Sequence, residues 1–144
     1  MDRFDIVSAL RTFATNKGWH FIFGSDEYAS LDQHDYLVDE NVFVCEITPL
    51  PIFGLHGGAV QDVTYSGIVM LGRKFELTTT ASLDENMLQK YDNRLKDLWT
   101  LLANNIGVFA CSNRLSIEVS NPANLINFYS TNIDFVKLDV KFSE

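Results

Sequence analysis

The pattern of apolar and polar positions begins with an amphipathic helix. Between residues 2 and 16 the apolar side chains recur every three or four positions, at Phe4, Val7, Leu10 and Ala14, with Ile6 and Phe13 widening the stripe. This is the period of a helix that lies on a core. Gly18 supplies a stop signal, and the aromatic and β-branched residues from 19 to 23 predict a short strand directly after it.

Residues 42–77 predict a long hairpin with a glycine-rich arm at its tip. Residues 42–48 are typical of a buried strand, which Pro49-Leu50-Pro51 ends because proline cannot donate to the ladder. Residues 60–77 return as a second strand with alternating faces. Between them lies Ile-Phe-Gly-Leu-His-Gly-Gly-Ala, from 52 to 59, which is too flexible for a core strand and too apolar for a free loop.

A second helix and a final group of strands complete the pattern. Ser82 and Glu85 have the spacing of a capping box, and apolar residues then recur every three or four positions until Gly107, which we expect to end the helix. Strand character resumes at Val108, Asn121-Pro122 predicts a turn, and residues 125–129 predict a returning strand. Residues 135–142 alternate strictly between apolar and polar, which predicts a strand with one face in water.

This order of elements predicts an α+β fold. Helices at the N-terminus and in the middle of the chain would pack on one face of a largely antiparallel sheet that contains the long hairpin. The 144 residues, of which 47% are hydrophobic, suffice for one core, so residues 1–144 predict a single domain.

The charge of the chain is concentrated in one segment. The formal net charge is −8, and no Lys or Arg lies between Lys17 and Arg73. Residues 24–41 form a polar stretch that we interpret as a long ordered loop, and a loop of this length usually has a function. Its acidic residues form the candidate acidic surface, which comprises Asp26, Glu27, Asp32, Asp35, Asp39 and Glu40. Such a chain is a poor general binder of nucleic acid, because phosphate contacts need Lys and Arg.

No motif in the chain indicates catalysis or a cofactor. The acidic loop lacks the fixed glycine and the terminal glutamate of an EF-hand, so we interpret it as a solvated surface and not a metal site. Cys45 and Cys111 each lie among apolar neighbours and predict two buried thiols in core strands, and the three histidines have no ligand spacing. There is no Gly-x-Ser-x-Gly or phosphate-binding glycine loop. We therefore expect a protein that is not an enzyme and that needs neither cofactor nor metal.

The arm is the most informative apolar segment. Ile52, Phe53 and Leu55 lie in it and belong to no periodic element. One interpretation is that the arm folds back over the domain's own sheet. The other is that it docks on a neighbouring subunit, because exposed apolar patches and open strand edges mark interaction sites.

The order of elements resembles that of the tail terminator, or tail completion, proteins of long-tailed bacteriophages. The matching pieces are the helix from Phe4 to Phe13, the hairpin of 42–77, the capped helix of 82–106 and the alternation of 135–142. The resemblance implies a homo-oligomeric ring, six-fold or higher, that caps the tail tube and joins it to the head connector. It implies a virion protein made in the host cytoplasm, with the arm on the next subunit and acidic residues facing DNA that passes without specific binding.

A second hypothesis is a cytoplasmic module whose acidic surface docks a basic protein partner. This interaction would weaken sharply above physiological ionic strength. No segment predicts a signal peptide or a membrane span, so both hypotheses expect a soluble protein.

Overall fold

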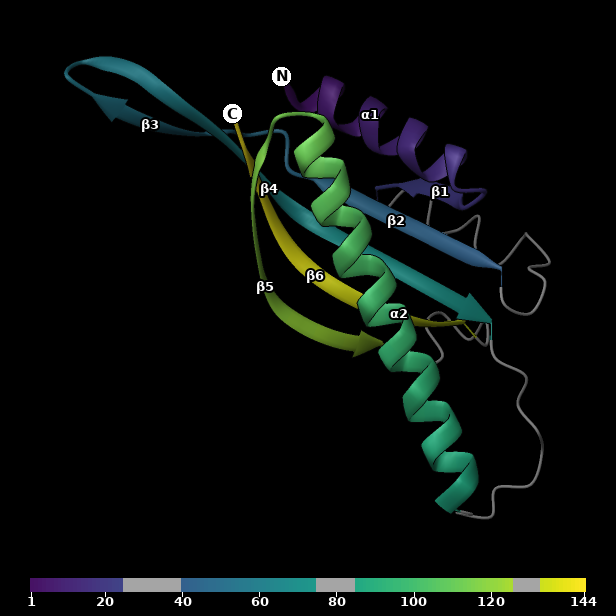
Figure 1. Cartoon of the computed structure of the whole chain (residues 1–144). Coiled ribbons are helices and arrows are strands. Elements are labelled where there is room, and N and C mark those ends of the chain that lie inside the picture. The colour runs from purple at the N-terminus through teal and green to yellow at the C-terminus, as the bar shows by residue number, and fades with distance from the viewer. Residues whose placement is uncertain (25–39, 75–84, 126–132) are drawn as a thin grey trace.

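The computed structural model describes residues 1–24, 40–74, 85–125 and 133–144 of the chain (Figure 1). Over these residues the fold is α+β, as predicted, with two helices and a six-stranded, mostly antiparallel sheet. The elements in chain order are α1 (Arg3–Asn16), β1 (His20–Phe23), β2 (Asn41–Ile47), β3 (Ile52–His56), β4 (Ala59–Lys74), α2 (Glu85–Ser112), β5 (Ser116–Leu125) and β6 (Ile133–Ser143).

The long strand β4 organises the sheet, whose strand order is β1-β2-β4-β6-β5. β4 pairs with β2 on one side and with β6 on the other, both antiparallel, while β1 pairs with β2 in parallel. The remaining strand, β3, lies off this order and pairs with the first part of β4. The predicted long hairpin is therefore confirmed over residues 42–74, with β2 and β3 lying along successive parts of β4, while residues 75–77 of the prediction lie outside the described residues.

Helix α1 begins and ends where its sequence signals place it. The side chain of Asp2 accepts from the backbone N–H of Asp5, and the side chain of Asp5 accepts from the backbone N–H of Asp2, which is a capping box. The helix buries Ile6, Leu10 and Ala14 against the sheet. Phe4 departs from the prediction, because its side chain is 76% exposed and takes no part in the core.

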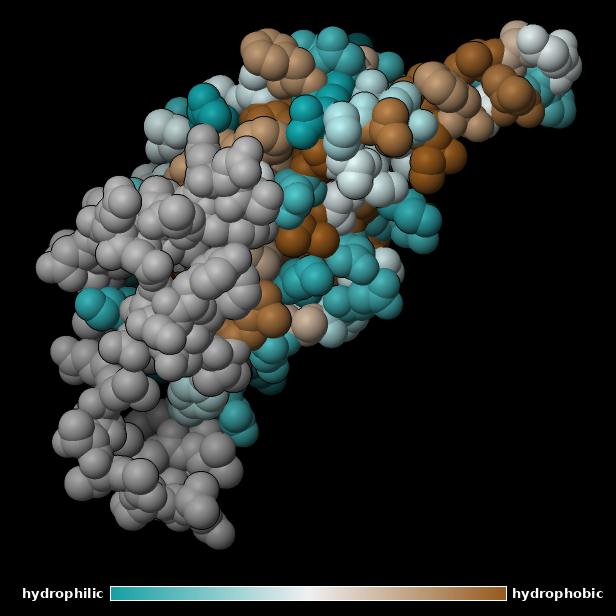
Figure 2. Space-filling model, turned by 180° about the vertical axis from the view of Figure 1, so that it is seen from behind, coloured by the Kyte–Doolittle hydropathy of each residue, from teal (hydrophilic) through white to brown (hydrophobic). Residues whose placement is uncertain are grey.

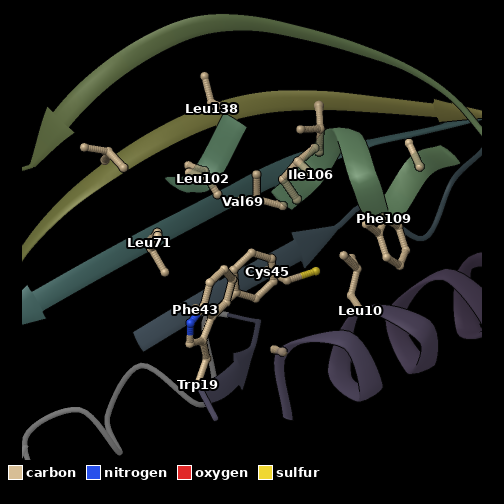
Figure 3. Close-up of a cluster of buried hydrophobic side chains, with 14 of the residues drawn as sticks. Leu10, Trp19, Phe43, Cys45, Val69, Leu71, Leu102, Ile106, Phe109 and Leu138 are labelled. Atoms are coloured by element: carbon tan, nitrogen blue, oxygen red, sulfur yellow. The ribbon is translucent and has the colours of Figure 1, made fainter. Parts of the chain in front are cut away.

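Both helices cover the same face of the sheet, and the main core lies between them and the strands (Figures 1 and 3). Phe109 of α2 joins the layers, since its ring lies 5.7 Å from that of Phe13 in α1 and 5.8 Å from that of Phe142 in β6, both edge-to-face. A smaller buried cluster lies on the opposite face of the sheet and comprises Ile22, Val42, Val44, Met70, Ile133 and Phe135.

Helix α2 extends further at its C-terminal end than the sequence predicts. Gly107 does not end the helix, which continues to Ser112, so the strand predicted from Val108 is wrong. Phe109 and Ala110 are buried in the core cluster and continue the apolar stripe of the helix past the glycine. Burial of these side chains outweighs the cost of one glycine in a helix interior, about 1 kcal/mol relative to alanine. The predicted helix start at Ser82 lies outside the described residues.

Strand β5 is continuous where the sequence predicts a turn. Asn121 and Pro122 do not form a turn, because β5 runs through them and pairs with β6 on both sides. The register shifts between Ser120 and Ala123, and Asn121 has a positive φ of 51°, which is the geometry of a bulge. Only Leu125 of the predicted strand 125–129 lies among the described residues.

The closing strand β6 confirms its predicted alternation from Val136 onward, whereas Phe135, on the face predicted to be in water, is buried in the smaller cluster. Val136, Leu138, Val140 and Phe142 are buried under the helices. Lys137, Asp139, Lys141 and Ser143, which lie between them in the sequence, are half-buried or exposed. Its last residues lie close to the N-terminus, because the amino group of Met1 bonds the carboxylate of Glu144, and both ends of the chain lie near the start of α1 (Figure 1).

Candidate protein-docking site

The predicted arm, residues 52–59, belongs to a two-stranded ribbon of residues 52–63 that projects from the body of the molecule (Figure 1). From here on the name arm refers to this whole ribbon. Its strands are joined at Gly57 and Gly58, whose φ angles of 61° and 79° suit the two-residue turn that favours glycine. Within the described chain, β3 pairs with β4 alone, and the ladder between β4 and β6 begins at Thr64. Both edges of the arm are therefore open.

The pairing register gives the arm one apolar face. Phe53 lies opposite Val63 and Leu55 opposite Val60, while Gln61 is the extra residue of a bulge. Directly opposite residues share a face of a ribbon, so these four apolar side chains lie together. The other face carries Ile52, Asp62 and His56.

The apolar side chains of the arm face solvent. Ile52, Phe53, Leu55 and Val60 are between 55% and 69% exposed. Figure 2 views the molecule from the side opposite to Figure 1, and apolar residues, in brown, follow the projecting arm. The arm therefore does not cover the domain's own sheet, which was one of the two interpretations left open by the sequence.

A hollow lies at the base of the arm, beside the N-terminal end of α1. Its volume is about 350 Å³. It is lined by Asp2, Arg3, Phe4, Val7, Phe23, Pro49 and Tyr65. Five of these seven residues are apolar or aromatic, and they come from α1, β1, the β2–β3 connection and β4. We call this surface the hollow.

Arg3 closes one side of the hollow. Its Nε donates to the carbonyl oxygen of Ile47 at 2.7 Å, and its guanidinium lies 5.3 Å from the centre of the Phe23 ring. These two contacts hold α1 to the ends of β1 and β2. The side chain of Phe4, on the next residue, is exposed.

A second depression lies on the face of the sheet opposite the helices. Its volume is about 360 Å³. Its lining is mainly polar and comprises Ile52, Thr64, Ser116, Ile117, Glu118, Lys141 and Ser143. The hydroxyls of Thr64 and Ser143 bond each other at 2.7 Å, and Glu118 and Lys141 are direct cross-strand partners. Polar and charged side chains of this kind are typical of a sheet surface in water.

The residues of the candidate acidic surface are placed only in part. Glu40 is half-buried and bonds the Nε2 atom of His20. Asp26, Glu27, Asp32, Asp35 and Asp39 lie outside the described residues. In the described part of the chain, no three His, Cys, Asp or Glu side chains gather in a way that would hold a metal ion.

The two cysteines differ, contrary to the prediction of two buried thiols. Cys45 is fully buried in β2, and burial raises the pKa of its thiol to about 12. Cys111 is exposed, because its segment is the end of α2 and not a core strand. The reason is the helical period, which directs Phe109 and Ala110 inward and Cys111 outward.

Of the arm and the hollow, only residues of the arm were predicted from the sequence. Ile52, Phe53 and Leu55 are the candidate residues from the sequence, and all three lie on the arm, Phe53 and Leu55 on its apolar face and Ile52 on the other face. Val60 and Val63 were missed as partners, although a turn centred on Gly57-Gly58 already indicates that they lie across from the arm's first strand. The hollow was missed altogether.

Comparisons with known proteins assign no family to the chain, since no protein-family model and no curated protein matches it. Among the helices that the structure describes, none is both long and apolar enough to cross a membrane.

Proposed function

We propose that this chain is a structural subunit of a bacteriophage head–tail junction, similar to a tail terminator, and that it forms a ring through its arm. The observation that carries this proposal is the arm: a ribbon with open edges and an exposed apolar face on an otherwise compact α+β body. The order of helices and strands supports it, because it agrees with that of the family.

An isolated two-stranded ribbon is at best marginally stable in water, and it gains stability by packing on a further surface. Fully burying an aliphatic or aromatic side chain contributes roughly 1.5–3 kcal/mol. Phe53, Leu55 and Val60 share the apolar face and are each more than half exposed, so docking of this face on a neighbouring subunit would recover about half of this for each. An arm that crosses to the next subunit also suits a ring, in which every subunit meets two neighbours.

The proposed ring is six-fold or higher, caps the tail tube and joins the head connector in the virion. The acidic residues at 26, 27, 32, 35, 39 and 40 would face its lumen. A wall with negative charge repels phosphate, so DNA would pass without specific binding. The net charge of −8 supports this role. The ring subunit catalyses no reaction and needs no cofactor.

Light scattering with size separation and negative-stain microscopy test the proposal. The chain is examined alone and with tail-tube and connector subunits, and rings are expected on the ends of tubes. Leu55→Glu should abolish the rings, because it places a carboxylate in the apolar contact. Val119→Glu is the matched control, since Val119 is a strand residue that is 49% exposed and lies outside the arm. A chain that stays monomeric with tube and connector subunits present would contradict the proposal.

The cluster of acidic residues favours a second candidate, docking of a basic protein partner. The two functions differ in their response to salt. Charge-based docking weakens steeply as ionic strength rises, whereas an apolar arm contact does not. Assembly that persists at 1 M NaCl therefore favours the ring.

A further inference from the structure

We infer that the hollow receives the arm of a second copy of this chain, so that one repeated head-to-tail contact builds the assembly. The inference deepens the proposed function and rests on it, since it names the surface on which the arm docks. The contact would place Phe53, Leu55, Val60 and Val63 of one subunit against the lining of the hollow in the next.

The two surfaces match in chemistry. The arm presents a continuous apolar face, and the hollow is lined by Phe4, Val7, Phe23, Pro49 and Tyr65. Phe4 is 76% exposed although it belongs to the apolar stripe of α1, and Leu50, beside Pro49, is 78% exposed. Large apolar side chains that are exposed on both surfaces gain most from covering each other.

A subunit cannot fill its own hollow with its own arm. β4 is one unbroken strand from Ala59 to Lys74, and Tyr65 of the hollow belongs to the same strand as the arm. From Tyr65 to the turn at Gly58 the chain advances seven residues, about 23 Å at the rise of a β-strand. The arm therefore leads away from the hollow at its base, and the occupant has to come from another molecule.

The other depression at the arm's base does not suit the same occupant. Its lining is dominated by Thr64, Ser116, Glu118, Lys141 and Ser143. Covering these groups with an apolar ribbon would remove them from water without supplying hydrogen-bond partners, which costs free energy. The hollow carries fewer polar groups, namely Asp2 and Arg3 at its edge and the hydroxyl of Tyr65.

A second copy is the occupant that the placement of the surfaces favours. The exposed apolar side chains of the arm and the apolar lining of the hollow belong to the same chain, so every copy carries both halves of the contact. In the head-to-tail arrangement that we infer, the arm of one copy meets the hollow of the next, and a contact of this kind is heterologous. Heterologous contacts repeat from subunit to subunit and close into rings when the rotation permits.

Complementation between two variants tests the inference. Phe4→Glu disables the hollow and keeps the arm, while Leu55→Glu disables the arm and keeps the hollow. Both side chains are exposed, so neither change should alter the melting temperature of the monomer. We expect each variant alone to lose association by at least about 10- to 100-fold. An equal mixture should form dimers and stop there, because only one intact arm and one intact hollow meet. Val108→Glu, at a 54% exposed helical residue outside both surfaces, should assemble like the unvaried chain.

The outcomes separate this inference from the proposed function. If Phe4→Glu assembles like the unvaried chain, or if the mixture stays monomeric, the hollow is not the receptor and the inference fails, while a ring built on another receptor surface remains. If the mixture dimerises but the rings never cap tail tubes, the inference stands and the phage role fails. An unvaried chain that never assembles, with tube subunits present, overturns both.

Discussion

Two glycines, Gly67 and Gly107, occupy opposite environments. A Cβ atom at Gly67 would lie 2.0 Å from the carbonyl oxygen of Glu46 and 2.9 Å from the Cα of Ile47, because β2 and β4 approach closely there. Gly107 is exposed inside α2, and a Cβ there meets nothing within 4 Å. The first glycine permits a contact between strands, and the second only weakens a helix.

Alanine at these two positions should shift stability in opposite directions. Gly67→Ala forces the strands apart and should lower the free energy of unfolding by about 2–3 kcal/mol. Gly107→Ala restricts the unfolded chain and favours the helix, so it should raise the free energy of unfolding by about 0.5–1 kcal/mol. Urea denaturation measures both. Shifts of the same sign would contradict the packing described for β4 or the course of α2.

The two thiols should differ in reactivity. Cys45 is buried and burial raises the pKa of its thiol to about 12, so almost no reactive thiolate is present near pH 8. Cys111 is exposed. A disulfide reagent at pH 8 should modify one thiol quickly in the folded protein and the second only after denaturation. Cys111→Ser should remove the fast phase. Two fast thiols would show that β2 is not in the core.

At the scale of elements, side-chain hydrogen bonds from Tyr91 and Trp99 tie α2 to the sheet, and the first of them reaches a buried carboxylate. The hydroxyl of Tyr91 in α2 donates to Oδ2 of Asp134 in β6 at 2.6 Å, and Asp134 is only 5% exposed. Tyr91→Phe leaves a buried carboxylate without this donor, so it should lower the free energy of unfolding by about 1–3 kcal/mol. Tyr65→Phe is the control, because its hydroxyl makes no hydrogen bond within the described residues, and it should have little effect on the monomer.

The same contact predicts a response to alkaline pH. Partial burial, followed by the hydrogen bond to Asp134, raises the pKa of Tyr91 above its usual value of about 10. The folded protein therefore retains this proton after the unfolded chain has lost it. The resulting stabilisation is complete below about pH 10 and is lost as the pH rises towards the pKa of the folded state. Tyr91→Phe should lose less stability than the unvaried chain between pH 9 and 11, as thermal denaturation at each pH will show.

The helices and strands were largely predictable because their periodicity comes from burial. Apart from Phe4, α1 follows its predicted apolar stripe, β2 is buried on both faces as its apolar run predicts, and β6 alternates as predicted from Val136 onward. The errors arose where local signals oppose tertiary packing. Gly107 and the pair Asn121-Pro122 are common stop and turn signals, but α2 and β5 continue through them, since Phe109 is buried and β6 pairs on both sides of the bulge. A sequence pattern does not include these distant contacts.

At the scale of the whole molecule, assembly should couple to stability. If subunits associate only when folded, the melting temperature rises with protein concentration. We expect this rise for the unvaried chain and for Val119→Glu, and a constant melting temperature for Leu55→Glu. Differential scanning calorimetry over a hundredfold range of concentration measures it. An equal rise in all three proteins would mean that association does not use the arm.

The arm and the hollow were not equally accessible to sequence reasoning. The arm is one continuous segment, and its apolar residues outside any periodic element already indicated a contact. The hollow combines side chains from four separate parts of the chain, from Asp2 to Tyr65, which only the folded sheet brings together. The sequence does not indicate that Phe4 is exposed, because its spacing in α1 is that of a core residue.

The bond between Met1 and Glu144 places both chain ends beside the hollow, which Asp2, Arg3 and Phe4 help to line. An affinity tag fused to either end would therefore extend from the same point of the surface and compete with an incoming arm. Tag position, usually a matter of convenience in protein production, becomes a variable of the experiment here. Assembly should be measured after proteolytic tag removal, and a tagged preparation that stays monomeric says nothing about the native subunit.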